Sequence, residues 1–186
     1  NFFTTMRCGR SISHRHPGMG SGVHFRDTMQ DIMPGIMFDP DGIKSWMHLL
    51  YRSVKASGKI TYSIHPTTFT CPNPLHNRCD AAVWGVFTLY KYLAETQNLD
   101  FLNEVVPYYD EGTGTILEHQ LRAMHSIGEN IGSHGLPMLF DCDWNDGLVV
   151  FSGARGGGES IMVAEQFIYA ANLLKEILEV AGRMEE

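Results

Sequence analysis

The chain has 186 residues, 44% of them hydrophobic and 19% charged, a composition that is typical of a globular protein and excludes a disordered one. Its 14 basic and 21 acidic residues give a net charge of −7, which disfavours nucleic acid or an anionic membrane as the main partner. No apolar run reaches the roughly 18 residues that a membrane span needs. The four cysteines lack a C-x-x-C spacing, which indicates reduced thiols and a cytoplasmic protein.

Apolar periodicity and helix caps predict a mostly helical chain. Pro34 ends the first helix, Asp41 caps the second, and Gly58 ends it. Asp80 and Asp100 stand at the starts of the third and fourth helices, and glycine- and proline-rich loops separate all of them. This pattern predicts an all-α fold of helical hairpins, as in an α/α toroid. The predicted helices cover 27–33, 42–57, 81–95, 100–106, 115–131 and 160–181.

The segment 141–148 reads Asp-Cys-Asp-Trp-Asn-Asp-Gly-Leu and lies in a long predicted loop, 133–158. Carboxylates are almost never fully buried unless they are paired, so a carboxylate-rich stretch around a tryptophan is a poor core. It suits a ligand with polar edges and an apolar face. A sugar ring is such a ligand.

Asp80 has two interpretations that the sequence leaves open. As a helix N-cap it contributes about 1 kcal/mol. As a general acid it needs a raised pKa, which burial favours and which the helix N-terminus and the neighbouring Arg78 oppose.

Three further groups of residues carry candidate chemistry. Arg26, Asp27 and Asp31 form either a solvated ion-pair network or a rim that binds sugar hydroxyls. A basic cluster near the N-terminus suits an anion such as phosphate, although a loose surface patch has the same composition; its members are Arg7, Arg10, His14, Arg15 and His16. The histidines show no ligand spacing, so no metal is expected.

Six blocks in order give the chain a resemblance to the cellobiose phosphorylase family, glycoside hydrolase family 94. The resemblance extends over nearly the whole chain. The blocks are Phe-Arg-Asp-Thr-Met-Gln-Asp (25–31), Arg-Cys-Asp-Ala-Ala-Val-Trp (78–84), Leu-Asn-Glu-Val-Val-Pro-Tyr (102–108), His-Gly-Leu-Pro (134–137), Asp-Trp-Asn-Asp-Gly (143–147) and Gly-Gly-Glu-Ser (157–160).

The resemblance implies that residues 1–186 are part of a single (α/α)6-barrel catalytic domain, without the N-terminal β-sandwich domain and the end of the barrel. It implies inverting phosphorolysis of β-glucosidic oligosaccharides of the cellobiose or cellodextrin type, with release of α-glucose 1-phosphate. The expected partners are the oligosaccharide and phosphate, the latter a substrate, and no cofactor is implied. A homodimer, or an assembly with the missing segments, is expected.

The site residues that the resemblance implies fall into three roles. Asp80 is the general acid, and Arg15 contacts phosphate. The remaining residues bind the sugar or line its cavity; they are Arg26, Asp27, Asp31, Trp144, Asp146 and Glu159. One departure concerns Ala81, because many relatives have a second aspartate at this position.

Two alternatives to a phosphorylase remain open. An inverting hydrolase on the same barrel would need a second carboxylate to activate water, for which Asp143, Asp146 and Glu159 are candidates. A non-catalytic sugar-binding fragment would bind sugar without any dependence on phosphate.

Overall fold

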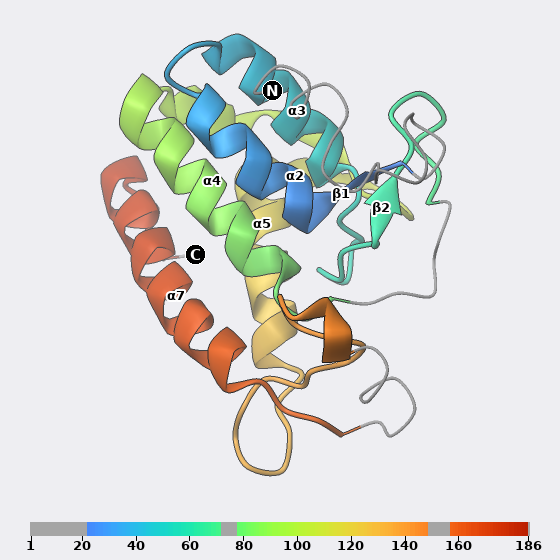
Figure 1. Ribbon diagram of the computed structural model, residues 1–186. Helices are drawn as coiled ribbons and strands as arrows, with labels where there is room; N and C mark the ends of the chain where they lie inside the picture. The colour runs from blue at the N-terminus through green and yellow to red at the C-terminus, as the bar shows by residue number, and fades with distance from the viewer. Residues whose placement is uncertain (1–21, 72–77, 149–156, 186) are drawn as a thin grey trace.

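The computed structural model describes residues 22–71, 78–148 and 157–185. These residues are mostly helical, with two small antiparallel strand pairs and three short 3₁₀ turns (Figure 1). The elements are β1 (Val23–His24), α2 (Phe25–Ile32), η2 (Met33–Gly35), α3 (Pro40–Tyr51), β2 (Ser63–Ile64), α4 (Ala81–Thr96), η3 (Leu99–Asn103), β3 (Val105–Pro107), β4 (Thr113–Thr115), α5 (Ile116–Gly128), η4 (Asp146–Leu148) and α7 (Ile161–Ala181).

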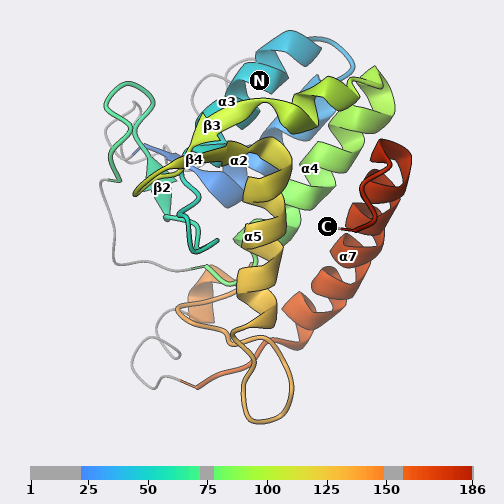
Figure 2. The ribbon, with the colours of Figure 1, turned by 180° about the vertical axis from the view of Figure 1, so that it is seen from behind.

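Helix α4 lies at the centre and packs against α2, α5 and α7. Its apolar side chains Val83, Val86 and Leu89 have no exposed surface, as expected for a helix with neighbours on several sides. Between α4 and α2, the Thr88 hydroxyl donates a hydrogen bond of 2.9 Å to the Met29 carbonyl. Figure 2 shows α5 on the side of α4 opposite α2, and the β3–β4 pair leads into α5.

A buried polar bridge joins α3 and α5 to the first turn of α4. The Tyr51 hydroxyl donates to Gln120 Oε1 at 2.9 Å, and Gln120 Nε2 donates to the Ala82 carbonyl at 3.0 Å. A Cβ at Gly85 would clash with Gln120 Oε1, so the bridge depends on a glycine at this position. These hydrogen bonds therefore hold the start of α4, where Asp80 lies, against α3 and α5.

Two predicted helix starts are wrong. Helix α3 begins at Pro40 and is capped by Asp39, which accepts from the Gly42 amide at 3.0 Å, because proline is favoured in the first helical turn. It ends at Tyr51, well before Gly58. The predicted helix capped by Asp100 is the 3₁₀ turn Leu99–Asn103, followed by strand β3.

The starts of the last two predicted helices are confirmed, although α5 ends at Gly128 and not at Ile131. Helix α5 begins at Ile116 behind a capping box between Thr115 and Glu118, a motif that satisfies two backbone donors at once. Helix α7 begins after Ser160, whose hydroxyl accepts from the Val163 amide at 3.1 Å. It ends at Ala181, and the next residue, Gly182, has a φ of 68°, the left-handed conformation that favours glycine at a helix end.

None of the helices that the structure describes has both the length and the apolar character for a membrane crossing. The described cysteines Cys71, Cys79 and Cys142 are free thiols.

Candidate active site

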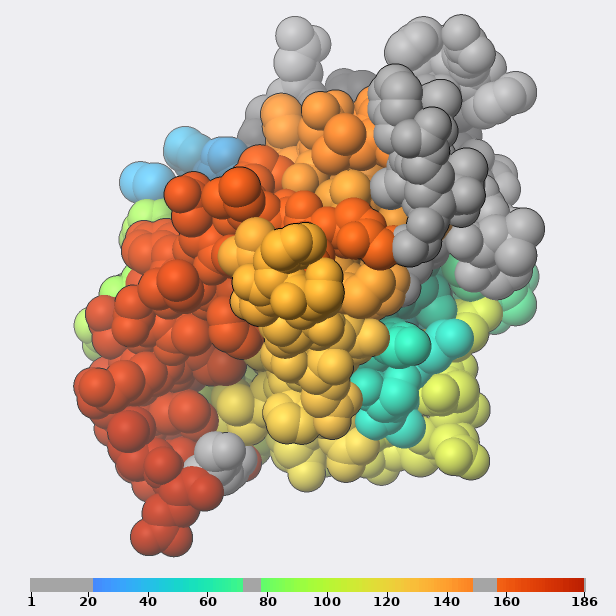
Figure 3. Space-filling model, turned by 90° about the horizontal axis from the view of Figure 1, so that it is seen from below, coloured from blue at the N-terminus to red at the C-terminus, as the bar shows by residue number. Residues whose placement is uncertain are grey.

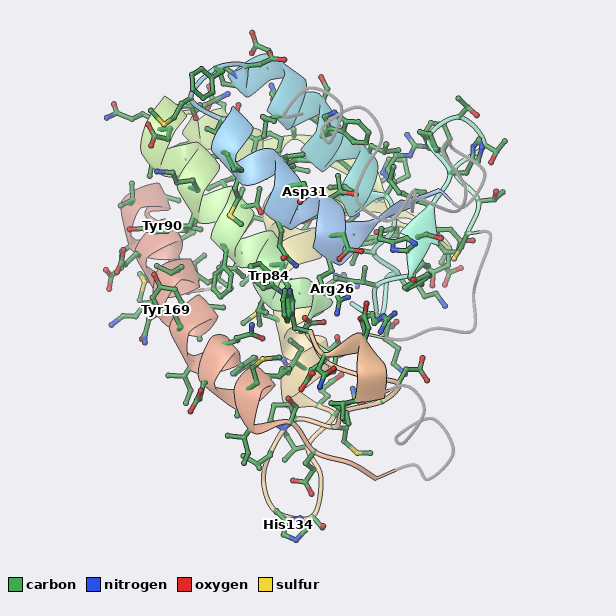
Figure 4. The ribbon with its side chains drawn as sticks, viewed as in Figure 1. Arg26, Asp31, Trp84, Tyr90, His134 and Tyr169 are labelled. Atoms are coloured by element: carbon green, nitrogen blue, oxygen red, sulfur yellow. The ribbon has the colours of Figure 1, made fainter. Side chains whose placement is uncertain are left out.

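Asp80 occupies the N-cap position of α4, but its carboxylate makes no capping hydrogen bond. It accepts instead from Trp84 Nε1, at 3.1 Å from Oδ2, and from Arg26 Nη1, at 3.4 Å from Oδ1. The interpretation of Asp80 as an ordinary helix cap is therefore wrong. Its side chain is directed towards an arginine and a tryptophan, and Figure 4 shows these two side by side where α2 and α4 approach each other.

The Asp80 side chain has no exposed surface. Burial raises the pKa of its carboxyl group above the ordinary value, because the charged form is disfavoured away from water. The Arg26 cation and the Trp84 hydrogen bond act in the opposite direction but do not cancel the effect. The opposing arginine is thus Arg26, not the sequence neighbour Arg78.

Arg26 connects the acid to the 141–148 segment. Its Nη1 also donates to the Asp143 carbonyl at 2.8 Å, and its Nη2 donates to Asp146 Oδ1 at 2.7 Å. Burial opposes the charge on Arg26, yet the carboxylates of Asp80, Asp146 and Asp27 raise its pKa above the ordinary value. This guanidinium is a permanent cation.

The predicted sugar-binding segment 141–148 is anchored through Asp143. This carboxylate accepts from the Ser160 hydroxyl at 2.7 Å and from the Asn145 amide at 2.8 Å. The next residue, Trp144, is 51% exposed, and its Nε1 donates to Gln30 Oε1 at 3.3 Å. The loop is therefore pinned at one end of α7 and presents an indole face to solvent.

Arg78 is a site residue that the sequence reasoning missed, since only its nearness to Asp80 was considered. Its Nη1 lies 2.9 Å from Asp146 Oδ1 and also contacts the Cys142 sulfur. Its guanidinium lies 5.1 Å from the centre of the Tyr62 ring, within the range of a cation–π contact. No sequence signal links Arg78 to residues more than sixty positions away.

Asp27 and Asp31 lie on α2 as predicted, but they have different surroundings. Asp27 pairs with His24, with 3.2 Å between Oδ2 and Nδ1, and with Arg26 at 3.4 Å. Asp31 lies one helical turn further along α2, away from Arg26 and Trp84 (Figure 4). Of these two aspartates, only Asp27 joins Asp80 and Asp146 in the cluster around Arg26.

Glu159 does not join the Asp80 cluster. Its carboxylate accepts from the backbone amides of His134 and Leu136, at 3.1 and 3.0 Å, and lies 2.8 Å from His134 Nδ1. His134 is at the far end of its loop from Arg26 in Figure 4. Figure 3 shows this loop protruding beside α7. Glu159 braces the loop, and the expectation that it lines the Asp80 cavity is not met.

Two other expectations from the sequence concern Arg15 and Ala81. The predicted phosphate contact Arg15 and the rest of its basic cluster lie outside the described residues. Ala81, where the sequence departs from the pattern of the resemblance, is the first residue of α4 and is buried. Among the described residues, no cluster of three His, Cys, Asp or Glu side chains could hold a metal ion.

The arrangement can therefore supply a carboxylic acid, two guanidinium groups and an exposed indole face within one region. These are the groups that a catalytic domain acting on glycosides needs. The sequence supports this class over its full length, because residues 1–186 match the model of the Glycosyl hydrolase 94 superfamily, catalytic domain. The chain belongs to this superfamily.

Curated relatives of the chain include several phosphorylases. A solabiose phosphorylase from Paenibacillus borealis is 33% identical over 91% of the chain and 23% of the relative. An N,N'-diacetylchitobiose phosphorylase from Vibrio furnissii is 30% identical over 95% and 21%, respectively. A 3-O-β-D-glucopyranosyl-β-D-glucuronide phosphorylase from P. borealis is 28% identical over 90% and 22%. The chain thus spans less than a quarter of the length of these relatives.

Proposed function

We propose that this chain carries the general acid of an inverting β-glycoside phosphorylase, and that Asp80 is that acid. The observation that carries the proposal is the buried Asp80 carboxyl group, whose pKa is raised and whose oxygens face Arg26 and Trp84 instead of the helix backbone. A general acid must hold its proton near neutral pH. The phosphorylase relatives support the same reaction class.

In the proposed reaction, inorganic phosphate attacks the anomeric carbon from the face opposite the leaving group. The bond between this carbon and the glycosidic oxygen breaks, and the Asp80 carboxyl group gives its proton to that oxygen. The products are a sugar α-1-phosphate and a shortened acceptor sugar. Phosphate is a substrate here, and the reaction as proposed needs no cofactor.

Arg26 links sugar binding to the acid. Its contact with Asp80 is 3.4 Å long, near the outer limit of a hydrogen bond. A sugar hydroxyl that engages this guanidinium would weaken the contact further. Since Arg26 lowers the pKa of Asp80, the carboxyl group would then hold its proton more firmly, at the moment when the proton is needed.

The hydrolase alternative is less well supported, because its candidate bases are already engaged. Asp143 accepts from Ser160 and Asn145, Asp146 pairs with two arginines, and Glu159 braces the His134 loop. A base that activates water needs an accessible oxygen about 6.5–9.5 Å from the acid. Of the three, only Asp146 has a largely exposed side chain, at 62%, and it is paired with two cations.

The proposed substrate is a β-linked disaccharide or short oligosaccharide. Cellobiose and cellodextrins with a glucose donor are our specific proposal, and they stand beside the different sugars that the names of the relatives specify. The exposed Trp144 is the proposed stacking surface for a sugar face. We also propose that the chain forms part of an (α/α)6 barrel in a cytoplasmic, homodimeric enzyme.

The test is sugar 1-phosphate release from cello-oligosaccharides and from the sugars of the relatives, with and without inorganic phosphate. The full-length protein that carries this chain and the chain alone are assayed side by side. Phosphate-dependent release by the full-length protein supports the proposal. Phosphate-independent release of free sugar would instead make it a hydrolase, and sugar binding without turnover would make it a binding protein.

A further inference from the structure

His119 on α5 is a buried histidine that the proposed reaction does not use. It has no exposed surface. Its ring stacks on Tyr108, with 4.0 Å between the ring centres and 22° between the planes. It also lies edge-to-face with Tyr51, at 6.2 Å between the centres. The imidazole is therefore enclosed by α5 itself, by the end of α3 and by the residue that follows β3.

The hydrogen bonding of this ring determines where its proton lies. Nδ1 of His119 is 2.8 Å from the Thr115 carbonyl oxygen. Because a carbonyl only accepts, Nδ1 carries the proton of the neutral ring. Nε2 is then an acceptor, and it is buried without a hydrogen-bond partner among the described residues. Nε2 is thus the atom that a second proton would occupy.

A second proton on His119 would place a positive charge in the interior. Burial lowers the pKa of His119 below its ordinary value, since the charged ring is disfavoured away from water. The two charged side chains that act on the ring both lie on α5. Arg122 lowers the pKa further, whereas Glu118 raises it. The carbonyls of Thr115 and Pro107 also raise the pKa, but together these groups do not cancel the effect of burial.

The side chains that face His119 from other elements offer no counter-charge. Burial raises the pKa values of Tyr51 and Tyr108, so both hydroxyl groups keep their protons when the imidazole takes one up. The carboxylate of Glu118 is already engaged by the Thr115 amide in the capping box. A protonated His119 is therefore a buried cation without a dedicated anion among the described residues, which is a costly arrangement.

His119 is linked to the starts of two helices. Its bond to Thr115 ties the ring to the residue that caps α5. Its neighbour Gln120 accepts from Tyr51, which also contacts the His119 ring, and donates to the Ala82 carbonyl in the first turn of α4. A change in the charge of this ring therefore acts on the first turn of α5 and, through Tyr51 and Gln120, on the first turn of α4.

We propose that His119 is an acid-sensitive switch: the neutral ring holds the first turns of α5 and α4 together, and protonation of the ring loosens both. The switch is a regulatory device of the fold. It goes beyond the proposed function and does not depend on it.

The direction of the pH effect follows from the two states of the ring. In an opened chain the pKa of a histidine is about 6.5, whereas burial lowers the pKa of His119 in the closed structure. Between these two values the open form binds more protons than the closed form. Acid therefore favours opening as the pH falls below about 6.5, and the closed form regains its full stability above that pH.

The test is hydrogen exchange at the backbone amides of residues 120–123, measured in the full-length protein from pH 8 to pH 5 and corrected for the intrinsic rate at each pH. In the wild-type protein, the opening constant should be level above about pH 7 and rise by up to about tenfold per pH unit below about pH 6.5. His119→Asn keeps an N–H donor for the Thr115 carbonyl but cannot titrate, so this rise should be absent.

His125→Asn is the matched control, because His125 lies on the same helix with a side chain that is 76% exposed and paired with Glu129. This variant should keep the wild-type rise. A rise that persists in His119→Asn would overturn the switch, and so would its loss in His125→Asn alone.

The wild-type protein decides if His119→Asn does not fold. An opening constant that stays level down to pH 5 contradicts the inference. A rise that coincides with titration of the His119 ring, followed by NMR, supports it. Failure of the proposed function would appear as absent sugar 1-phosphate release and would leave these exchange measurements unchanged.

Discussion

Trp84 lies one helical turn after Asp80 on α4, and its indole nitrogen donates a hydrogen bond of 3.1 Å to Asp80 Oδ2. Residues four apart share a helix face, so the helix itself sets this geometry. With this bond, the buried carboxylate does not bind the backbone amides that an N-cap side chain would bind. Trp84 therefore helps to make Asp80 a site residue.

Replacing Asp80 by Asn removes the proton donor and keeps the shape of the side chain. The turnover number on unactivated sugars should fall by about 10²–10⁴-fold, the usual contribution of general acid catalysis, while the sugar KM changes little. A substrate with an acidic leaving group, such as a nitrophenyl glycoside, should lose less activity. Steady-state kinetics on both substrates would show this, with Asp100→Asn as control. Equal losses on both substrates would contradict the acid assignment.

Replacing Trp84 by Phe removes one donor that stabilises ionised Asp80, so the pKa of this carboxyl group should rise further. A general acid is active only while it is protonated. Activity falls as the pH rises through its pKa, and the alkaline limb of the kcat/KM profile should therefore move to higher pH. Trp46→Phe on α3 makes the same change away from Asp80 and should leave this limb in place. A shift to lower pH in Trp84→Phe would exclude Asp80 as the titrating acid.

Asp143 and Ser160 should be energetically coupled. Each alanine substitution should destabilise the protein by about 1–3 kcal/mol, because it leaves a buried partner without its hydrogen bond. The double variant should lose less than the sum of the two, as neighbours that share an interaction do. Thr115→Ala removes a comparable cap on α5 and should combine additively with Asp143→Ala. Urea unfolding of all variants measures these terms, and additivity of Asp143→Ala with Ser160→Ala would contradict the coupling.

Gly85→Ala should destabilise the protein by about 1–3 kcal/mol, since the new methyl group displaces Gln120 from a packed interior. Gly128→Ala, the matched control on α5, meets no atom within 4 Å and should be neutral or stabilising by up to about 1 kcal/mol. Thermal unfolding of both variants checks this. If Gly85→Ala is as stable as Gly128→Ala, the Tyr51–Gln120 bridge does not constrain α4.

Much of the helical architecture could be predicted from local sequence. The Thr115–Glu118 capping box and the Ser160 cap are local signals, and both helices begin where these signals place them. The start of α3 was wrong because two aspartates, Asp39 and Asp41, compete for the cap, and the proline between them decides the choice. The 3₁₀ turn at 99–103 has no periodicity of its own that distinguishes it from an α-helix.

The candidate site could be predicted only in part. Asp80, Arg26, Asp27, Trp144 and Asp146 were expected together, and the described structure brings their segments together. The roles within the cluster were not predictable, because they depend on contacts between residues far apart in the sequence. Asp143 anchors the 141–148 segment to Ser160, and Glu159 binds the backbone of the His134 loop. The sequence alone does not distinguish these roles among the four carboxylates of this region.

The Asp143–Ser160 hydrogen bond also determines the order in which the site can be assembled during synthesis. The acid and its arginine leave the ribosome early, but the loop that holds Arg26 is not anchored until residue 160 has followed. Before that point, α2 and α4 can pair and Asp80 can meet Arg26 and Trp84. The surroundings of Arg26, however, are complete only after the start of α7 has been made.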